Sequence, residues 1–173
     1  MINGTSNKWY AIYVASRSEK KVNELLTEKG IHVYLPLVKS LRIWSDRKKM
    51  VEFPLMNGYV FVNINIITEK DKVLQTRGVV NFVRSEGKVA VIRDIEISRL
   101  KQIVELGYDI ESDRMAQSYN EGDKIKIVAG PLKGIEGYIV NNNSGKNFEI
   151  VLESIHQTVR VKLPEEILTP VKK

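Results

Sequence analysis

The segment Pro54–Val62, "PLMNGYVFV", decides how the N-terminal half of this chain is interpreted. A strand with one face in the core and the other in water alternates apolar and polar residues. Here both faces are apolar, because Tyr59 and Phe61 project to one side while Val60 and Val62 project to the other. The strand is therefore either buried on both faces, or one face is kept for a partner.

Regular elements are expected on both sides of this strand, in the order β-α-β-β-β-β-α-β-α. The other expected strands are "KWYAIYVA", "IHVYLPLV", a hairpin in "SLRIWSDRKKMVEF" and "VVNFVRS". A capping box at Ser16 and Glu19 predicts the start of the first helix. Thr68 with Asp71 predicts the second helix, and Asp94 the third. The pattern indicates an α+β sandwich with helices packed on a mostly antiparallel sheet.

The C-terminal part has a different pattern. Residues 107–120 show no sustained period, so we expect a flexible linker between a domain at 8–106 and a second domain at 121–173. From Glu121 onward, short β-branched strands are separated by Gly, Asn and Ser turns, with no helical spacing between them. Closely spaced short strands of this kind predict a small closed β-barrel.

Composition limits the classes of function. A hydrophobic share of 43% with 28% charged residues is typical of a globular protein. The absence of cysteine excludes disulfides, Cys-based zinc sites and thiol nucleophiles, and it fits a reducing cytoplasm. The sequence shows no apolar run approaching the roughly 20 residues that span a bilayer, and no signal-peptide stretch at its start. We expect a cytoplasmic protein without a membrane partner.

The positive charge is concentrated in the N-terminal part. Residues 1–106 hold 18 Lys and Arg against 11 Asp and Glu, whereas residues 107–173 hold 9 against 10. A partner rich in phosphate would therefore bind the first domain, although basic surfaces also occur without nucleic acid.

Catalytic motifs are missing from the sequence. His32 and His156 fall in different domains, and neither belongs to a motif with a nucleophile or a metal ligand. The turn "GPLKG" lacks the Gly-Lys-Ser/Thr ending of a phosphate-binding loop. We predict no enzymatic activity, no cofactor and no metal.

Two groups of motifs carry a family resemblance. The stretch "EGDKIKIVAGPLKGIEGYIV", with its turn at Gly130, Pro131 and Gly134, resembles the KOW motif of transcription factors and some ribosomal proteins. "KWYAIYVASRSEKKV", "NGYVFVNI" and "TRGVVNFVR" resemble the N-terminal (NGN) domain of the NusG family of transcription elongation factors. That family joins such a domain through a flexible linker to a KOW SH3-like barrel, and the resemblance covers about Lys8 to Val171.

Within the family, "TRGVVNFVR" and Pro-Leu-x-x-x-Tyr-x-Phe-Val are similar to specialised paralogues of the RfaH and UpxY type. Housekeeping members read Phe-Pro-Gly-Tyr at the corresponding stretch, where this chain has Met56 and Asn57 in the first two positions. The resemblance therefore implies an operon-specific antitermination factor that acts as a monomer.

The resemblance implies a surface for RNA polymerase. Family members bind the clamp helices of the largest polymerase subunit through an apolar pocket of the N-terminal domain, bridge the DNA cleft and promote processive elongation. Carried over to this sequence, the pocket residues are Tyr13, Met56, Tyr59, Phe61 and Phe82. The alternative is that all five are core residues. We predict that one face of the strand is core and the other binds polymerase.

Further contacts follow from the same resemblance. Residues expected to touch non-template or upstream DNA are Arg17, Lys20 and Lys21 in the first helix, Arg77, and Arg47, Lys48 and Lys49 at the hairpin tip. The alternative is that these are solvated surface charges. RfaH reaches the opposite side of the cleft through a His-Thr-Thr segment, and the aligned residues here are Glu69, Lys70 and Asp71.

The second domain leaves one competing function open. A Phe in the barrel of housekeeping NusG helps to bind Rho or ribosomal protein S10, whereas the aligned residue here is His156, which argues against both contacts. KOW barrels also occur in ribosome- or RNA-associated proteins, but the near-neutral charge of this barrel disfavours that function. Its β-branched strands disfavour refolding into a helical hairpin.

Overall fold

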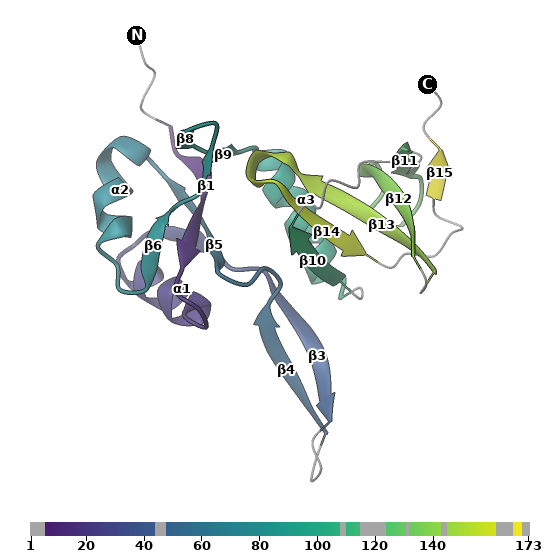
Figure 1. Ribbon diagram of the computed structural model, residues 1–173, viewed down its shortest axis with the longest axis horizontal. Helices are drawn as coiled ribbons and strands as arrows, with labels where there is room; N and C mark the ends of the chain where they lie inside the picture. The colour runs from purple at the N-terminus through teal and green to yellow at the C-terminus, as the bar shows by residue number, and fades with distance from the viewer. Residues whose placement is uncertain are drawn as a thin grey trace. The chain divides into compact units, whose positions relative to one another are not determined.

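The computed structural model describes residues 6–43, 48–107, 110–114, 124–130, 132–142, 145–161 and 168–170. The chain divides into two compact units, Met1–Ile97 and Ser98–Lys173. The division falls within helix α3 (Asp94–Glu105), whereas the sequence suggested a boundary after residue 106. Each unit has its own sheet (Figure 1).

The first unit is built on a five-stranded antiparallel sheet. Its strands follow the order β2 (His32–Tyr34), β5 (Tyr59–Ile64), β1 (Lys8–Val14) and β6 (Val79–Phe82), and β9 (Val91–Ile92) also pairs with β1. Two helices, α1 (Glu19–Glu28) and α2 (Ile66–Leu74), contribute Val22, Leu26 and Val73 to the core on one face of this sheet. The predicted α+β sandwich is confirmed.

Two hairpins complete the first unit. The larger one pairs β3 (Leu37–Ile43) with β4 (Lys48–Pro54), and Figure 1 shows it extending away from the sheet as an arm. The smaller one pairs β7 (Arg84–Ser85) with β8 (Lys88–Val89). The expected single strand "IHVYLPLV" is divided into β2 and β3 around Pro36, because proline has no N–H to donate to a ladder. Arg47, at the hairpin tip, lies outside the described residues.

The starts of the first two helices differ from the prediction. Ser16 and Glu19 do not form a capping box, because α1 begins at Glu19 itself, and Ser18 in the N-cap position makes no side-chain cap hydrogen bond. Helix α2 begins three residues before the expected cap at Thr68, and the Oδ1 of Asn65 accepts a hydrogen bond from Ile67 N–H at 3.0 Å. Helix α3 begins at Asp94, as predicted.

The second unit contains a six-stranded antiparallel sheet of the small-barrel type. Its strand order is β10 (Ile110–Arg114), β14 (Gln157–Val161), β13 (Gly145–Leu152), β12 (Glu136–Asn142), β11 (Lys124–Ile127) and β15 (Leu168–Pro170). A 3-10 turn, η1 (Glu153–Ile155), connects β13 to β14. Strand β10 falls within the expected linker: it pairs with β14 from Ile110 opposite Val161 to Arg114 opposite Gln157. The segment has few apolar residues, so hydrophobic patterning did not reveal a strand that is held by backbone pairing.

The predicted KOW turn closes between β11 and β12. Gly130 and Gly134 have φ values of 75° and 92°, and the Gly134 N–H donates to the Ile127 carbonyl at 2.8 Å. Pro131 lies outside the described residues. Gly137 serves a different purpose, because a Cβ there would lie 2.6 Å from the Cζ of Phe148 and would clash with the Glu149 carbonyl. Only glycine allows this close approach of β12 to β13.

Candidate functional site

Three of the predicted polymerase-binding residues share one face of the first sheet. Tyr13 of β1 lies directly opposite Tyr59 of β5, with their ring centroids 5.0 Å apart, and the Tyr59 hydroxyl donates to the Tyr13 hydroxyl at 3.4 Å. Phe61 lies opposite Ala11 on the same face, and its ring stacks on Tyr34 of β2 at 6.1 Å. The structure therefore brings Tyr13, Tyr59 and Phe61 together as the strand alternation predicted.

Phe82 does not belong to this group. It pairs with Ile12, which in turn pairs with Val60, so these three side chains point to the opposite face of the sheet. There Phe82 is 2% exposed and packs edge-on against Tyr10, with ring centroids 6.1 Å apart. The prediction that Phe82 lies near the other pocket residues is wrong, since sequence spacing does not reveal which face a separate strand presents to a distant one.

Burial divides the remaining pocket residues. Met56, Tyr59 and Phe61 are 1%, 6% and 0% exposed, whereas Tyr13 is 37% exposed. Strand β5 is thus buried on both faces, and the accessible part of the aromatic face is the outer edge of Tyr13. Met56 lies in the turn that leads into β5, where its carbonyl accepts from Tyr59 N–H at 3.4 Å.

The turn that precedes β5 is held by a buried carboxylate. Glu19, which is 5% exposed in the first turn of α1, accepts a hydrogen bond from Gly58 N–H at 2.7 Å. The Gly58 carbonyl accepts from Val14 N–H at 2.9 Å, and the residue has a φ of 80° that favours glycine. Glu19 therefore connects the helix to the segment "PLMNG" across 39 positions of sequence.

The predicted nucleic-acid residues of the first unit are arranged around α1. Arg17 lies in the turn before the helix rather than within it, with a φ of 61° and an exposed side chain. A hydrogen bond of 2.8 Å from Ala15 N–H to the Gly78 carbonyl brings this turn beside the one that carries Arg77, which is also exposed. The structure thus places the Arg17 and Arg77 turns side by side.

The lysines of α1 have different surroundings. Lys20 reaches the hairpin, and its Nζ donates to the Glu52 carbonyl of β4 at 2.8 Å. Lys21 instead forms an exposed ion pair with Glu24 of the same helix at 3.0 Å. Lys48 and Lys49 are exposed at the start of β4. The two basic patches expected from the sequence are therefore joined through Lys20.

Two hollows, each of about 640 Å³, lie along β4 beside α1. We call the first the helix groove; it is lined by Val14, Ser16, Arg17, Glu19, Lys20, Phe53, Pro54, Asn57 and Gly58. We call the second the hairpin groove; it is lined by Lys20, Lys39, Lys49, Met50, Val51 and Glu52. Lys39 and Phe53 were not among the predicted site residues. The signal that could have indicated them is their position on the hairpin arms beside the predicted basic tip.

The remaining predicted contacts lie on α2 and in the second unit. Glu69 has a structural role, since its carboxylate accepts from Asn65 N–H at 2.9 Å at the start of α2. Lys70 is half-buried and Asp71 is exposed on the same helix. In the second unit, His156 is exposed directly after η1, with a left-handed φ of 52°.

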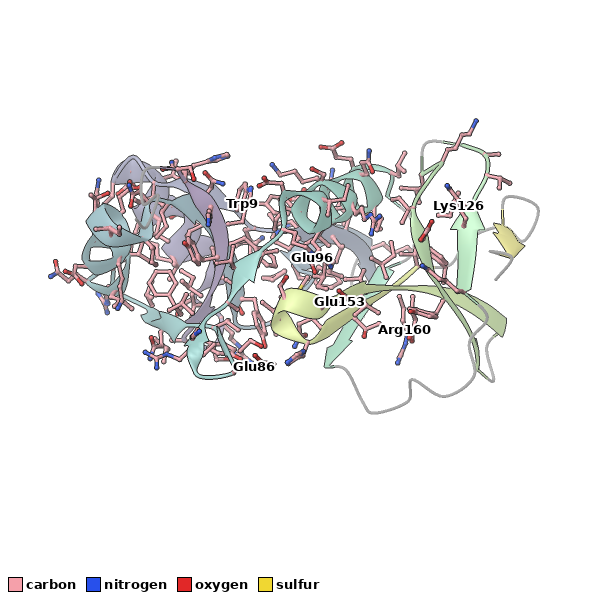
Figure 2. The ribbon with its side chains drawn as sticks, turned by 90° about the horizontal axis from the view of Figure 1, so that it is seen from above. Trp9, Glu86, Glu96, Lys126, Glu153 and Arg160 are labelled. Carbon is pink, nitrogen blue, oxygen red and sulfur yellow. The ribbon has the colours of Figure 1, made fainter. Side chains whose placement is uncertain are left out.

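Charge pairs of the second unit bridge neighbouring strands. Lys124 and Glu136 form an ion pair at 2.9 Å across β11 and β12, which raises the pKa of Lys124 and lowers that of Glu136. Arg160 of β14 pairs at 2.5 Å with Glu149, which lies opposite it on β13. Figure 2 shows Lys126 and Arg160 on separate strands of this unit. These pairs hold the sheet together and leave the basic surface of the first unit as the stronger candidate for an anionic partner.

The described part of the chain contains no group of three or more His, Asp or Glu residues that could hold a metal ion. No helix among the same residues is long and apolar enough to cross a membrane.

Comparison with known proteins identifies the family. Residues 7–101 match the family model described as "Transcription termination factor nusG". The chain belongs to the NusG family. This match covers more than half of the sequence and includes β1, α1, the hairpin and β5.

Individual NusG proteins show similarity over most of their length. The chain is 28% identical to the transcription termination/antitermination protein NusG of Borreliella burgdorferi, over 78% of this chain and 82% of that protein. It is 23% identical to NusG of Thermus thermophilus, over 82% and 86% of the two chains. The solved structure "Domain interaction in Thermotoga maritima NusG" has a TM-score of 0.61 at 21% identity, covers 98% of this chain and 100% of its own, and shows the shared fold. The protein is accordingly a transcription termination/antitermination factor of the NusG type.

Proposed function

We propose that this NusG-family protein binds RNA polymerase through the edge of the aromatic face at Tyr13 and thereby promotes processive elongation. The half-exposed Tyr13 ring, which rests on Tyr59, is the observation that supports this proposal. A tyrosine with an apolar ring and a polar tip suits a surface that is wet when free and dry when bound. The contact expected from the family is with the clamp helices of the largest subunit.

The mechanism requires little chemistry from the protein. A factor that binds the clamp helices and reaches across the DNA cleft would hold the polymerase closed and disfavour the opening that accompanies pausing. The buried residues Phe61 and Met56 would support the turn and the strand that present Tyr13, while the tyrosine itself would contact the partner.

The operon-specific role is part of the same proposal. It is supported by Met56 and Asn57, which stand where housekeeping members have Phe and Pro, and by the exposed Arg17 and Arg77 on adjoining turns. In this role the basic turns would contact the non-template strand while Tyr13 binds polymerase. The salt dependence of binding to elongation complexes would reflect the phosphate contacts.

Binding of the full chain to purified polymerase tests the proposal. A buried aromatic anchor contributes about 2 kcal/mol or more to an interface, so Tyr13→Ala is expected to weaken binding roughly 30-fold. Ile67→Ala is the matched control, because Ile67 is 68% exposed but lies on α2, and its loss should leave affinity unchanged. Equal affinities of the wild type and a folded Tyr13→Ala variant would contradict the proposal.

A further inference from the structure

We propose that the helix groove and the hairpin groove form one continuous binding track for single-stranded nucleic acid, with Lys20 as the residue that joins them. The inference rests on the proposed function, because it defines the nucleic-acid surface of the same unit. It adds Lys39 and Phe53 to that surface, and it specifies a single strand rather than a duplex.

Continuity follows from the position of Lys20. Its side chain lines both grooves, and its ammonium donates to the Glu52 carbonyl of β4 at 2.8 Å. Phe53 and Pro54 line the helix groove, and Val51 and Glu52 line the hairpin groove, so consecutive residues of one strand pass from one groove into the other.

Charge favours an anionic occupant. The two linings together contain four cationic side chains, Arg17, Lys20, Lys39 and Lys49, but only two carboxylates. Both carboxylates are engaged within the protein. Glu19 accepts from Gly58 N–H at 2.7 Å, and the Glu52 carboxylate pairs with Lys39 at 3.6 Å. Like charges gathered in this way are relieved when phosphates bind between them.

The apolar part of the lining favours a single strand. Phe53 and Pro54 stand beside the cations of the helix groove, and Met50, which is 56% exposed, stands beside those of the hairpin groove. Unpaired bases pack against such surfaces, whereas a duplex keeps its bases stacked inside and presents mainly phosphates. An acidic peptide would satisfy the charges but would leave the apolar surface without a matching partner.

Lys20 also acts as a positioning residue. Its hydrogen bond to β4 fixes the hairpin arm against α1, and an ammonium has three N–H donors, so it can hold the carbonyl and a phosphate together. A bound strand would therefore engage both grooves at once, and losing Lys20 would weaken contacts made by Arg17 and Lys49 as well.

Fluorescence anisotropy of the full chain with a labelled single-stranded DNA of about 12 nucleotides tests this inference, since single-strand sites commonly span about 4 to 16 nucleotides. The same sequence as RNA and as duplex DNA, and a poly-glutamate peptide, serve as comparison probes. We expect the single strands to bind more tightly than the duplex and the peptide at equal salt. The DNA and RNA arms establish which single strand is preferred.

Substitutions distinguish the track from general surface charge. Lys20→Gln and Lys39→Gln are each expected to weaken single-strand binding roughly three- to tenfold, and each should reduce the salt slope by about 0.7 for one lost phosphate contact. Lys21→Gln is the matched control, because Lys21 is on the same helix but lines neither groove. Lys20→Arg should restore binding, and Phe53→Leu should weaken it about fivefold through lost stacking.

Three results would overturn the inference: duplex binding as tight as single-strand binding, equal losses for Lys20→Gln and Lys21→Gln, or no single-strand binding at low salt. These measurements contain no polymerase, so they are separate from the proposed function. Tyr13→Ala should leave single-strand binding unchanged, and Lys20→Gln should leave binding to free polymerase unchanged.

Discussion

Replacing Glu19 by alanine tests how the segment that precedes β5 is held. The carboxylate is 5% exposed and accepts from Gly58 N–H at 2.7 Å, while the backbone of Gly58 also pairs with Val14. Glu19→Ala removes the acceptor and leaves a partly buried N–H without its partner. Glu19→Gln keeps an oxygen in the same place and loses only the charge.

The magnitude follows from the two interactions that are lost. A hydrogen bond to a charged group contributes about 1.5 to 3 kcal/mol. A carboxylate in the first turn of a helix adds about 0.3 to 1 kcal/mol through the helix dipole. Part of this is offset because alanine favours the helix, so we expect Glu19→Ala to lower the free energy of unfolding by about 2 kcal/mol. For a unit of this size that corresponds to a fall in Tm of roughly 10 °C, with about half the effect for Glu19→Gln.

Urea unfolding followed by tryptophan fluorescence measures this effect in the first unit. Both tryptophans, Trp9 and Trp44, belong to residues 1–97, and Trp9 is buried against the ring of His32. Glu24→Ala is the control, because its ion pair with Lys21 is exposed and contributes at most about 0.5 kcal/mol. If Glu19→Ala destabilises the unit no more than Glu24→Ala does, the buried carboxylate does not hold the turn and the reasoning is refuted.

Three further predictions concern single positions. Gly137→Ala should destabilise the second unit by about 1 to 3 kcal/mol, seen as earlier loss of its β-sheet circular dichroism, because the new methyl would overlap the Phe148 ring; an unchanged transition would contradict the close approach. Burial raises the pKa of Tyr10, so its contribution to stability is complete below about pH 10 and is lost as the pH rises through the higher folded value; Tyr10→Phe should abolish that alkaline fall in the urea midpoint, and an identical fall in both proteins would argue against it. Asn65→Ala should cost about 1 kcal/mol through loss of the helix cap, whereas Asn65→Ser should cost little.

Local patterns predicted most elements of both units. Alternation in "KWYAIYVA" and "GYVFVNI" corresponds to β1 and β5, and the spacing of apolar residues after Asp94 corresponds to α3. These signals are reliable because the side-chain period of a strand or helix is fixed by its backbone geometry. The KOW turn was equally predictable, since Gly130 and Gly134 occupy positive φ values that few other residues adopt.

The predictions that failed depended on distant partners. The pair of Ser16 and Glu19 has the spacing of a capping box, but the Glu19 carboxylate accepts instead from Gly58. Phe82 was assigned to the wrong face because its orientation depends on the register between β6 and β1. Strand β10 was missed because its pairing with β14 depends on backbone groups rather than on apolar side chains.

The sequence by itself determined the order of elements, the basic character of the first unit and the family resemblance, because each depends on residues that are close together along the chain or on total charge. Only the tertiary structure decided that β5 is buried on both faces, that Tyr13 is the accessible tyrosine, and that Lys20 joins α1 to the hairpin. The physical reason is that burial and hydrogen-bond partners arise from contacts between segments far apart in sequence. Lys20 and Glu52 are 32 positions apart, and only folding brings the ammonium to the carbonyl that it contacts.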